Sequence, residues 1–204
     1  MQTFIDHARS LGERIAAGDE QREWFGRLAA GQSPQALFIT CSDSRVVPSL
    51  ITGARPGDLF ELRTAGNAVP PYRVERPSGE AATIEYAVSV LQVPDIVVCG
   101  HSHCGAIGAR VRGEDLRAVP AVAGWLNSQL PDDLGALRSD AEADTGVAAA
   151  VQRNVREQMD RLRAYPCVAE RIDAGQLRLH GWFYAVDTGL VLAHQPAVDA
   201  FLPL

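Results

Sequence analysis

The sequence predicts an α/β fold, in which a mostly parallel central β-sheet is flanked by helices and preceded by an N-terminal helical arm. Apolar runs of strand length alternate with longer segments of helical periodicity, as is typical of α/β proteins. The run "DIVVCGH" at 95–101 is almost continuously apolar, as expected for a strand buried on both faces of a parallel sheet. With 204 residues, 47% of them hydrophobic, and no linker or internal repeat, residues 1–204 are predicted to form a single domain.

The first predicted element is helical. Apolar residues recur at helical spacing over 3–30 with charged residues between them, and residues 1–30 form the predicted arm. Trp24 and Phe25 would offer apolar surface to a second copy of the chain, so we expect the arm to take part in dimer formation. The turn sequence "GQSP" at 31–34 ends the arm.

Strands and helices alternate beyond the arm. Strands are predicted where strand-forming apolar residues gather between turn signals, and helices where apolar residues recur every three or four positions. In chain order the predicted elements are strands at 36–42 and 58–66, a proline-rich loop at 69–79, a helix at 80–93, a strand at 95–101, helices at 104–111, 121–130 and 145–165, and two strands joined at "DTG" within 177–194.

Charge and composition exclude several classes of protein. The chain has 19 Lys and Arg against 25 Asp and Glu, a net charge of -6, and no basic stripe, so nucleic acid is not an expected partner. No apolar run approaches the roughly 20 residues of a membrane helix, and the N-terminal sequence lacks the apolar core of a secretory signal. We therefore expect a cytoplasmic protein, whose four cysteines serve metal binding or burial rather than disulfides.

Two cysteines and two histidines gather at the end of the 95–101 strand, in "VVCGHSHCGA" at 97–106. Ligands bind beyond the carboxyl ends of strands in open α/β sheets, so His101 stands at the expected place and Cys104 can fold back beside it. Cys99 lies two strand residues, about 6.6 Å, below that edge and is predicted to be a core residue. His103 is interpreted as a polar rim residue, with proton transfer to buffer as the alternative.

A third metal ligand is predicted at the end of another strand. Cys41 closes the apolar run "ALFITC", and together Cys41, His101 and Cys104 would form a zinc site of two thiolates and one imidazole. Three protein ligands leave the fourth position open, which marks a catalytic zinc. Cys167 could in principle supply a fourth ligand, but it lies in a helical region without a supporting motif, and burial is the preferred interpretation.

The stretches "CSDSR" at 41–45 and "GHSHCG" at 100–105 resemble the two signatures of the β-class carbonic anhydrases, and related segments run from about residue 20 to residue 195. The resemblance implies reversible hydration of carbon dioxide to bicarbonate and a proton, by attack of zinc-bound hydroxide, with one zinc ion per chain. It also implies self-association as a dimer or a higher even oligomer. Hydrolysis of carbon disulfide or carbonyl sulfide on the same scaffold is an alternative, and so is a zinc-binding homologue without catalysis.

Asp43 and Arg45 follow the first cysteine on the same turn. Asp43 could accept a hydrogen bond from zinc-bound water or hydroxide, and a bidentate pair with Arg45 would hold its carboxylate ionised. In isolation "SDSR" would suggest a helix cap with a surface ion pair, but the resemblance implies that these two residues are the family's catalytic pair. In some family members the aspartate moves onto the zinc at low pH, and for this chain that movement is a hypothesis.

The resemblance also implies a substrate pocket. Gln32 corresponds to a glutamine that hydrogen-bonds the substrate in plant-type members, and Gly105 would let backbone N–H groups approach the substrate. Phe38 replaces the tryptophan of bicarbonate-inhibited members and has no N–H donor, so we expect that inhibitory pocket to be absent or altered and Arg63 to be structural. The pocket-lining positions that reach across the dimer interface match Phe60, Ala65 and Tyr86.

Overall fold

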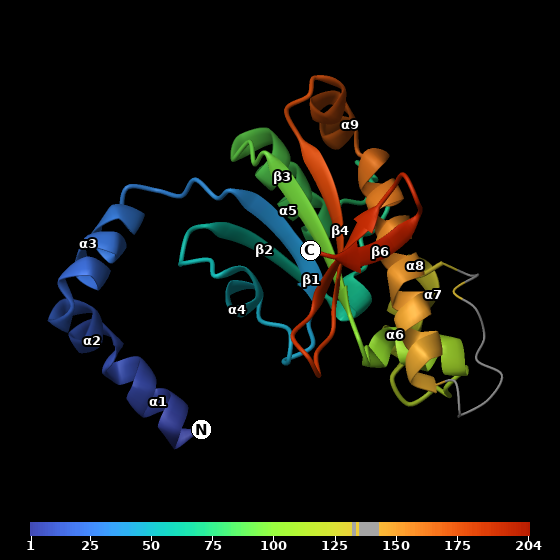
Figure 1. The fold of residues 1–204 in the computed structure, drawn as a ribbon, viewed down its shortest axis with the longest axis horizontal. Coiled ribbons are helices and arrows are strands. Elements are labelled where there is room, and N and C mark those ends of the chain that lie inside the picture. The colour runs from blue at the N-terminus through green and yellow to red at the C-terminus, as the bar shows by residue number, and fades with distance from the viewer. Residues whose placement is uncertain (132–133, 135–142) are drawn as a thin grey trace. The chain divides into compact units, whose positions relative to one another are not determined.

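The structure is a computed structural model that describes residues 1–131, 134 and 143–204 (Figure 1). The chain divides into two compact units, Met1–Ser33 and Pro34–Leu204. The first unit holds the predicted arm, and the second holds the sheet with the predicted metal ligands. Within the described residues, no helix is long and apolar enough to cross a membrane.

The arm consists of three short helices. These are α1 (Gln2–Arg9), α2 (Leu11–Ala17) and α3 (Asp19–Leu28). Between α2 and α3 the backbone of Gly18 is extended, with φ −111° and ψ 120°, and glycine costs about 1 kcal/mol relative to alanine inside a helix. The helical character predicted for 3–30 is confirmed, and the structure adds the interruption at Gly18.

The second unit is built on a six-stranded sheet in the order β2-β1-β3-β4-β5-β6. The first four strands are parallel to one another, and the last two are antiparallel additions at one edge. The mostly parallel sheet expected from the sequence is therefore confirmed. The strands are β1 (Ala36–Cys41), β2 (Leu59–Thr64), β3 (Asp95–His101), β4 (Arg178–Tyr184), β5 (Val191–Gln195) and β6 (Ala200–Pro203).

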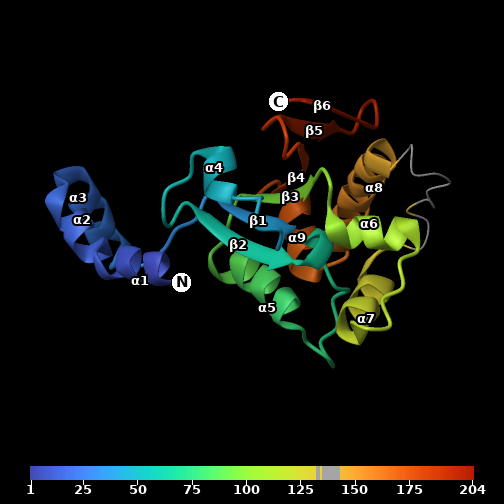
Figure 2. The same ribbon diagram turned by 90° about the horizontal axis from the view of Figure 1, so that it is seen from below.

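Helices connect the strands and cover the sheet. Figure 2 shows α5 and α9 on one face and the short α4 on the other, while α8 lies against β3 and β4. The elements that the sequence did not predict, α4, η1 and β6, are all five residues or shorter. The helical segments are α4 (Pro48–Thr52), η1 (Ala65–Asn67), α5 (Gly79–Glu85), η2 (Tyr86–Val90), α6 (Gly105–Arg112), α7 (Pro120–Gln129), α8 (Ala143–Arg163) and α9 (Pro166–Asp173).

The two central strands are buried on both faces. Every residue of β1 is buried, and so is every residue of β3 after Asp95. Alternate side chains enter different clusters: Ile39 and Val98 join the large core under α5, α8 and α9, whereas Phe38 and Cys99 pack on the opposite face. This burial explains the continuous apolar runs in the sequence.

The strand order brings the ends of β1 and β3 together. From β1 the chain moves to β2 on one side and then returns to β3 on the other side of β1. Such a reversal creates a crevice at the carboxyl ends of the two strands, where α/β proteins bind ligands. Thr40 pairs with Cys99 in the register, so Cys41 and His101 end adjacent strands at this crevice.

Gly100 allows α8 to approach this part of the sheet. A Cβ atom at Gly100 would lie 2.4 Å from Cγ1 of Val151 and 2.8 Å from Cγ2 of Val155, both on α8. No side chain fits between the strand and the helix at this point. This close packing fixes the position of β3 relative to α8 at the residue before His101.

Candidate metal centre

Three predicted ligands meet at the crevice. Cys41 comes from the end of β1, His101 from the end of β3, and Cys104 from the residue that precedes α6. Their ligand atoms all lie within 4.8 Å of one another, and all three residues are buried. Tetrahedral zinc with ordinary Zn–S and Zn–N bonds requires ligand atoms about 3.5–3.8 Å apart. The three side chains are therefore arranged compatibly with one zinc ion.

The backbone orients the imidazole of His101. Its Nδ1 lies 2.8 Å from the carbonyl oxygen of Ser102, and since a carbonyl only accepts, Nδ1 carries the proton. Nε2 is then the unprotonated nitrogen; it is buried and has no hydrogen-bond partner among the described residues. A nitrogen lone pair that is buried without a partner, with its other ring nitrogen held by a carbonyl, is what a metal-binding histidine requires.

Ser102 is itself held in place by the segment after β4. Its N–H donates to the carbonyl of Tyr184 at 2.9 Å, and its Oγ accepts from the N–H of Val186 at 2.9 Å. The ring of His101 is therefore oriented through Ser102 by β4 and the turn after it.

The thiols of Cys41 and Cys104 share a hydrogen bond. The hydrogen bond from Cys104 lowers the pKa of Cys41 far below that of a free thiol, whereas holding this proton beside Cys41, together with burial, raises the pKa of Cys104. The sulfur of Cys41 also accepts a hydrogen bond from the backbone N–H of Gly66. The sulfur of Cys104 accepts from the backbone N–H groups of Ala106 and Ile107, in the first turn of α6. A soft divalent cation can replace the shared proton, and zinc favours this combination of sulfur and nitrogen ligands.

Asp43 and Arg45 form a bidentate ion pair beside the three ligands. Arg45 Nε donates to Oδ1 at 2.9 Å and Nη2 to Oδ2 at 2.7 Å, while the backbone N–H of Arg45 donates to Oδ1 at 3.0 Å. The guanidinium holds the pKa of Asp43 well below its usual range. Oδ2 lies 3.8 Å from Nε2 of His101, so an ionised carboxylate borders the ligand triangle.

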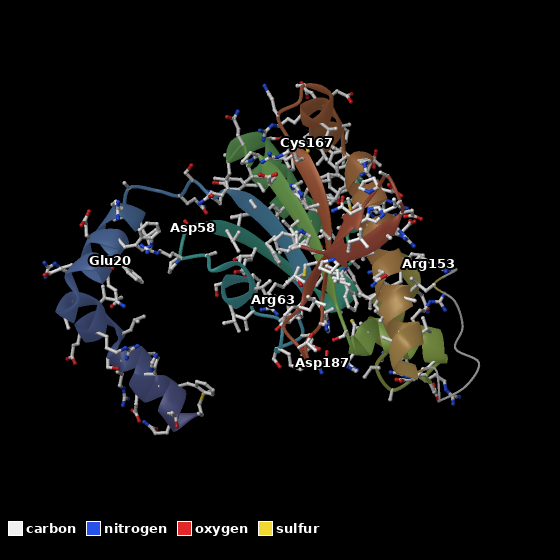
Figure 3. All side chains as sticks on the ribbon, in the orientation of Figure 1. Glu20, Asp58, Arg63, Arg153, Cys167 and Asp187 are labelled. Atoms are coloured by element: carbon white, nitrogen blue, oxygen red, sulfur yellow. The ribbon has the colours of Figure 1, made fainter. Side chains whose placement is uncertain are left out.

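Arg63 holds the loop that carries Cys41 and Asp43. From β2 its Nε and Nη2 donate to the carbonyl of Cys41 at 3.1 and 2.9 Å, and Nη2 donates to the carbonyls of Asp43 and Val46 at 2.8 Å each. Figure 3 shows Arg63 beside α4, the helix that follows this loop. The structural role expected for Arg63 is therefore to hold this loop, because its side chain donates to three of the loop's carbonyl groups.

Replacing Arg63 by methionine should loosen this loop. We expect Arg63→Met to lower the free energy of unfolding by about 1–2 kcal/mol, because three carbonyls lose their donor at a partly exposed position. Turnover should fall about tenfold, because Asp43 is no longer held in place. Urea unfolding and turnover measure the two effects. Arg178→Met, which removes an arginine that is paired with Asp95 at the other end of the sheet, should leave turnover unchanged.

The residues expected to line a substrate pocket come from several elements. Phe60 on β2 and Tyr86 at the start of η2 pack with ring centroids 5.9 Å apart. Ala65 follows Thr64, which pairs with Cys41 in the sheet. Gln32 belongs to the first unit and is exposed, so it remains a sequence-based prediction.

Gly105 begins α6 directly after Cys104. It is absent from the residues with positive φ, and an added Cβ would meet nothing within 4 Å. Turn geometry therefore does not require glycine at this position. Open space beside the amides of the first turn of α6 is compatible with the approach of a small ligand.

The remaining cysteines and His103 lie outside the ligand triangle. Cys99 is fully buried in the cluster with Phe38, and burial raises the pKa of its thiol to about 12. Cys167 is partly exposed on α9, and Figure 3 shows it near the top of the view, away from the labelled Arg63. His103 is exposed with φ 53°, and its carbonyl accepts from Arg45 at 3.1 Å.

Proteins of known family are similar to this chain over most of its length. A family model described as carbonic anhydrase matches residues 36–191. A carbonic anhydrase of Pseudomonas aeruginosa is 47% identical over 181 residues, 88% of this chain and 82% of the relative, and carbonic anhydrase 1 of Escherichia coli O157:H7 is 43% identical over 181 residues, with the same two shares.

Solved structures of β-carbonic anhydrases are also similar to this chain. The β-carbonic anhydrase CcaA matches with a TM-score of 0.86 and 35% identity over 100% of this chain and 99% of its own. One of two tetrameric β-carbonic anhydrases from Sordaria macrospora matches with a TM-score of 0.78 and 31% identity, over 95% of this chain and 97% of its own.

Proposed function

This chain belongs to the β class of the carbonic anhydrases, and we propose which of its residues carry out the family's reaction. That reaction is the reversible hydration of carbon dioxide to bicarbonate and a proton, and zinc is its cofactor. The observation that supports the assignment of residues is the convergence of three buried ligands at the end of β1 and β3, with an ionised Asp43–Arg45 pair beside them.

Cys41, His101 and Cys104 hold one zinc ion per chain in this proposal. When bound, zinc supplies the Lewis acidity that makes water a nucleophile near neutral pH. Three protein ligands leave one position for the reactants, and the carboxylate of Asp43 borders the ligand triangle. A purely structural zinc site would have closed with a fourth protein ligand and would have no use for a paired carboxylate.

Asp43 orients the attacking oxygen by accepting its hydrogen bond. Its pKa is held well below the usual range by Arg45, so it stays ionised at neutral pH and does not store the proton that the reaction releases. Arg45 aims the carboxylate through two parallel hydrogen bonds, which is the geometry that limits rotation most. The pair therefore positions the nucleophile, and the proton leaves to solvent or buffer.

The residues Phe60, Ala65 and Tyr86 form the apolar lining for carbon dioxide in this proposal, and Gln32 and the backbone at Gly105 bind the oxygen atoms of bicarbonate. These assignments rest on the resemblance to the family and on the contact between the two aromatic rings. An apolar lining suits an uncharged substrate, whereas polar groups are needed for the product.

The chain self-associates as a dimer or a higher even oligomer in this proposal, with residues 1–30 taking part in the contact. The exposed apolar side chains of the arm, which include Phe4 and Leu11, support this proposal. One relative of known structure is described as tetrameric. Location in the cytoplasm stays a prediction from the sequence.

The activity is tested by stopped-flow hydration of carbon dioxide, using protein of measured zinc content. We expect one zinc per chain, loss of activity when a chelator removes the metal, and recovery when zinc is added back. Carbon disulfide and carbonyl sulfide serve as competing substrates and should be turned over poorly. Protein that holds its full complement of zinc but is inactive from neutral to alkaline pH would contradict the proposal.

A further inference from the structure

The peptide group between Ala65 and Gly66 connects the metal centre with helix α7. Its N–H, on Gly66, is one of the hydrogen-bond donors to the thiol of Cys41. Its C=O, on Ala65, accepts a hydrogen bond of 2.9 Å from Nε1 of Trp125. An indole on α7 is therefore linked to a metal ligand through a single peptide group.

The next peptide group is held from α8. Nδ2 of Asn154 donates to the carbonyl of Gly66 at 3.0 Å, and Oδ1 of Asn154 accepts from Nε2 of Gln158 at 2.8 Å. Both side chains are completely buried. Gly66 itself has φ 74°, in the left-handed region that favours glycine. The carbonyls on both sides of the Gly66 N–H are thus fixed by different helices, and the direction of this N–H is fixed with them.

Hydrogen bonds at the two ends of a peptide group strengthen one another. A donor on the carbonyl polarises the group and makes its N–H a better donor, by about 10–30% per bond. An N–H that bonds a thiolate withdraws electron density from the sulfur and weakens its donation to a metal. Because two thiolates offset much of the charge of zinc, weaker donation from Cys41 leaves the metal a stronger Lewis acid.

We propose that Trp125 is a positioning residue of the metal centre, which acts through the Ala65–Gly66 peptide group to direct an N–H at Cys41 and to raise the Lewis acidity of a bound zinc ion. The inference rests on the metal centre proposed above. Trp125 acts 60 residues from Ala65 in the sequence and lies outside both signature segments.

The test compares wild-type protein with Trp125→Phe, in which an aromatic ring remains but the N–H donor is lost. Cobalt(II) replaces zinc, and the absorption band for charge transfer from thiolate to cobalt reports on the electron density of the sulfur. We expect this band to move to lower energy in Trp125→Phe. In the zinc protein, kcat should fall about tenfold at unchanged metal content, the lower end of what outer partners of metal ligands contribute.

Tyr165→Phe is the matched control. Oη of the buried Tyr165 donates to the carbonyl of Pro70 at 2.6 Å, so this variant also removes one donor to the segment after β2. The affected peptide group is not among the donors to Cys41. We expect lower stability but an unmoved cobalt band and unchanged kcat. An equal shift of the cobalt band in both variants would overturn the inference, because the shift would then come from a general loss of packing around the segment after β2.

Two further results separate this inference from the metal centre on which it rests. A wild-type cobalt protein without a thiolate band would overturn both, whereas a normal wild-type band that Trp125→Phe leaves unmoved would overturn this inference alone. If Trp125→Phe does not fold, as judged by circular dichroism, benzothienylalanine introduced at position 125 makes the same comparison. It keeps the shape of the double ring and replaces the N–H by sulfur.

Discussion

Cys104→Ser should lose both zinc and activity while the fold stays intact. Serine cannot supply the thiolate that zinc prefers, and its hydroxyl is hardly ionised at neutral pH. Cys104 occupies the N-cap position of α6, and serine is among the best residues for that position, so the helix should not suffer. We expect zinc content near zero by atomic emission and a loss of kcat/KM on the order of 10³-fold or more.

Cys99→Ser provides the comparison for this experiment. Cys99 lies near the ligands in the sequence, but its side chain packs against Phe38 on the opposite face of the sheet. A buried hydroxyl should lower stability by about 1–3 kcal/mol and leave one zinc per chain. Retention of stoichiometric zinc by Cys104→Ser would refute the ligand assignment.

Asp43→Asn should keep the metal and lose turnover. The amide has the shape of the carboxylate but carries no charge and has only one acceptor oxygen, so one of the two guanidinium bonds is lost and the other no longer joins two opposite charges. The attacking oxygen then faces an acceptor that is weaker and can rotate. We expect kcat to fall about 10²-fold with little change in zinc content, measured by stopped-flow hydration.

The pH dependence of the Asp43 variant follows from the lowered pKa. A carboxyl group whose pKa is lowered in the folded protein stabilises the fold fully at pH values above its unfolded pKa, about 3.9. This stabilisation is lost as the pH falls through the lower pKa of the folded protein. Asp43 is therefore ionised throughout the working range. Asp43→Asn should lower the whole pH–rate profile without moving its midpoint, and a shift of the midpoint would indicate that Asp43 itself titrates in the reaction.

The chain contains a matched control for this variant. Asp115 and Arg117 have the same spacing, and Arg117 donates to the carboxylate from its backbone N–H at 3.0 Å and from its guanidinium at 2.7–3.0 Å. This pair is not part of the Cys41–His101–Cys104 group. Asp115→Asn should leave hydration unchanged, so a comparable loss in both variants would show that Asp43→Asn acts through general electrostatics.

Much of the sheet could be predicted from the sequence because strand burial leaves a local pattern. The run at 95–101 is continuously apolar since β3 is covered on both faces, and this prediction holds to the residue. β6 was missed because four residues at the sheet edge, ending in Pro203, have too little periodicity to identify a strand. The helical character of the arm was predicted, but the periodic pattern does not show where its helices end, because it does not record that Gly18 leaves the helical conformation.

Local patterns in the chain are enough to identify the residues that could bind a metal and to predict that they meet. Cys41 and His101 each end an apolar run, and the carboxyl ends of adjacent parallel strands lie at one edge. Cys104 follows at a spacing that a single turn can close.

The bonds that hold these groups in place depend on the packed fold. Arg63 bonds the carbonyls around Asp43 from a different strand, and Trp125 bonds the carbonyl of Ala65 from a helix 60 residues away. Such bonds join a side chain to a distant backbone group. Every residue has a backbone carbonyl, so no local pattern identifies the one that a given side chain reaches, and the packed fold alone determines the pairing.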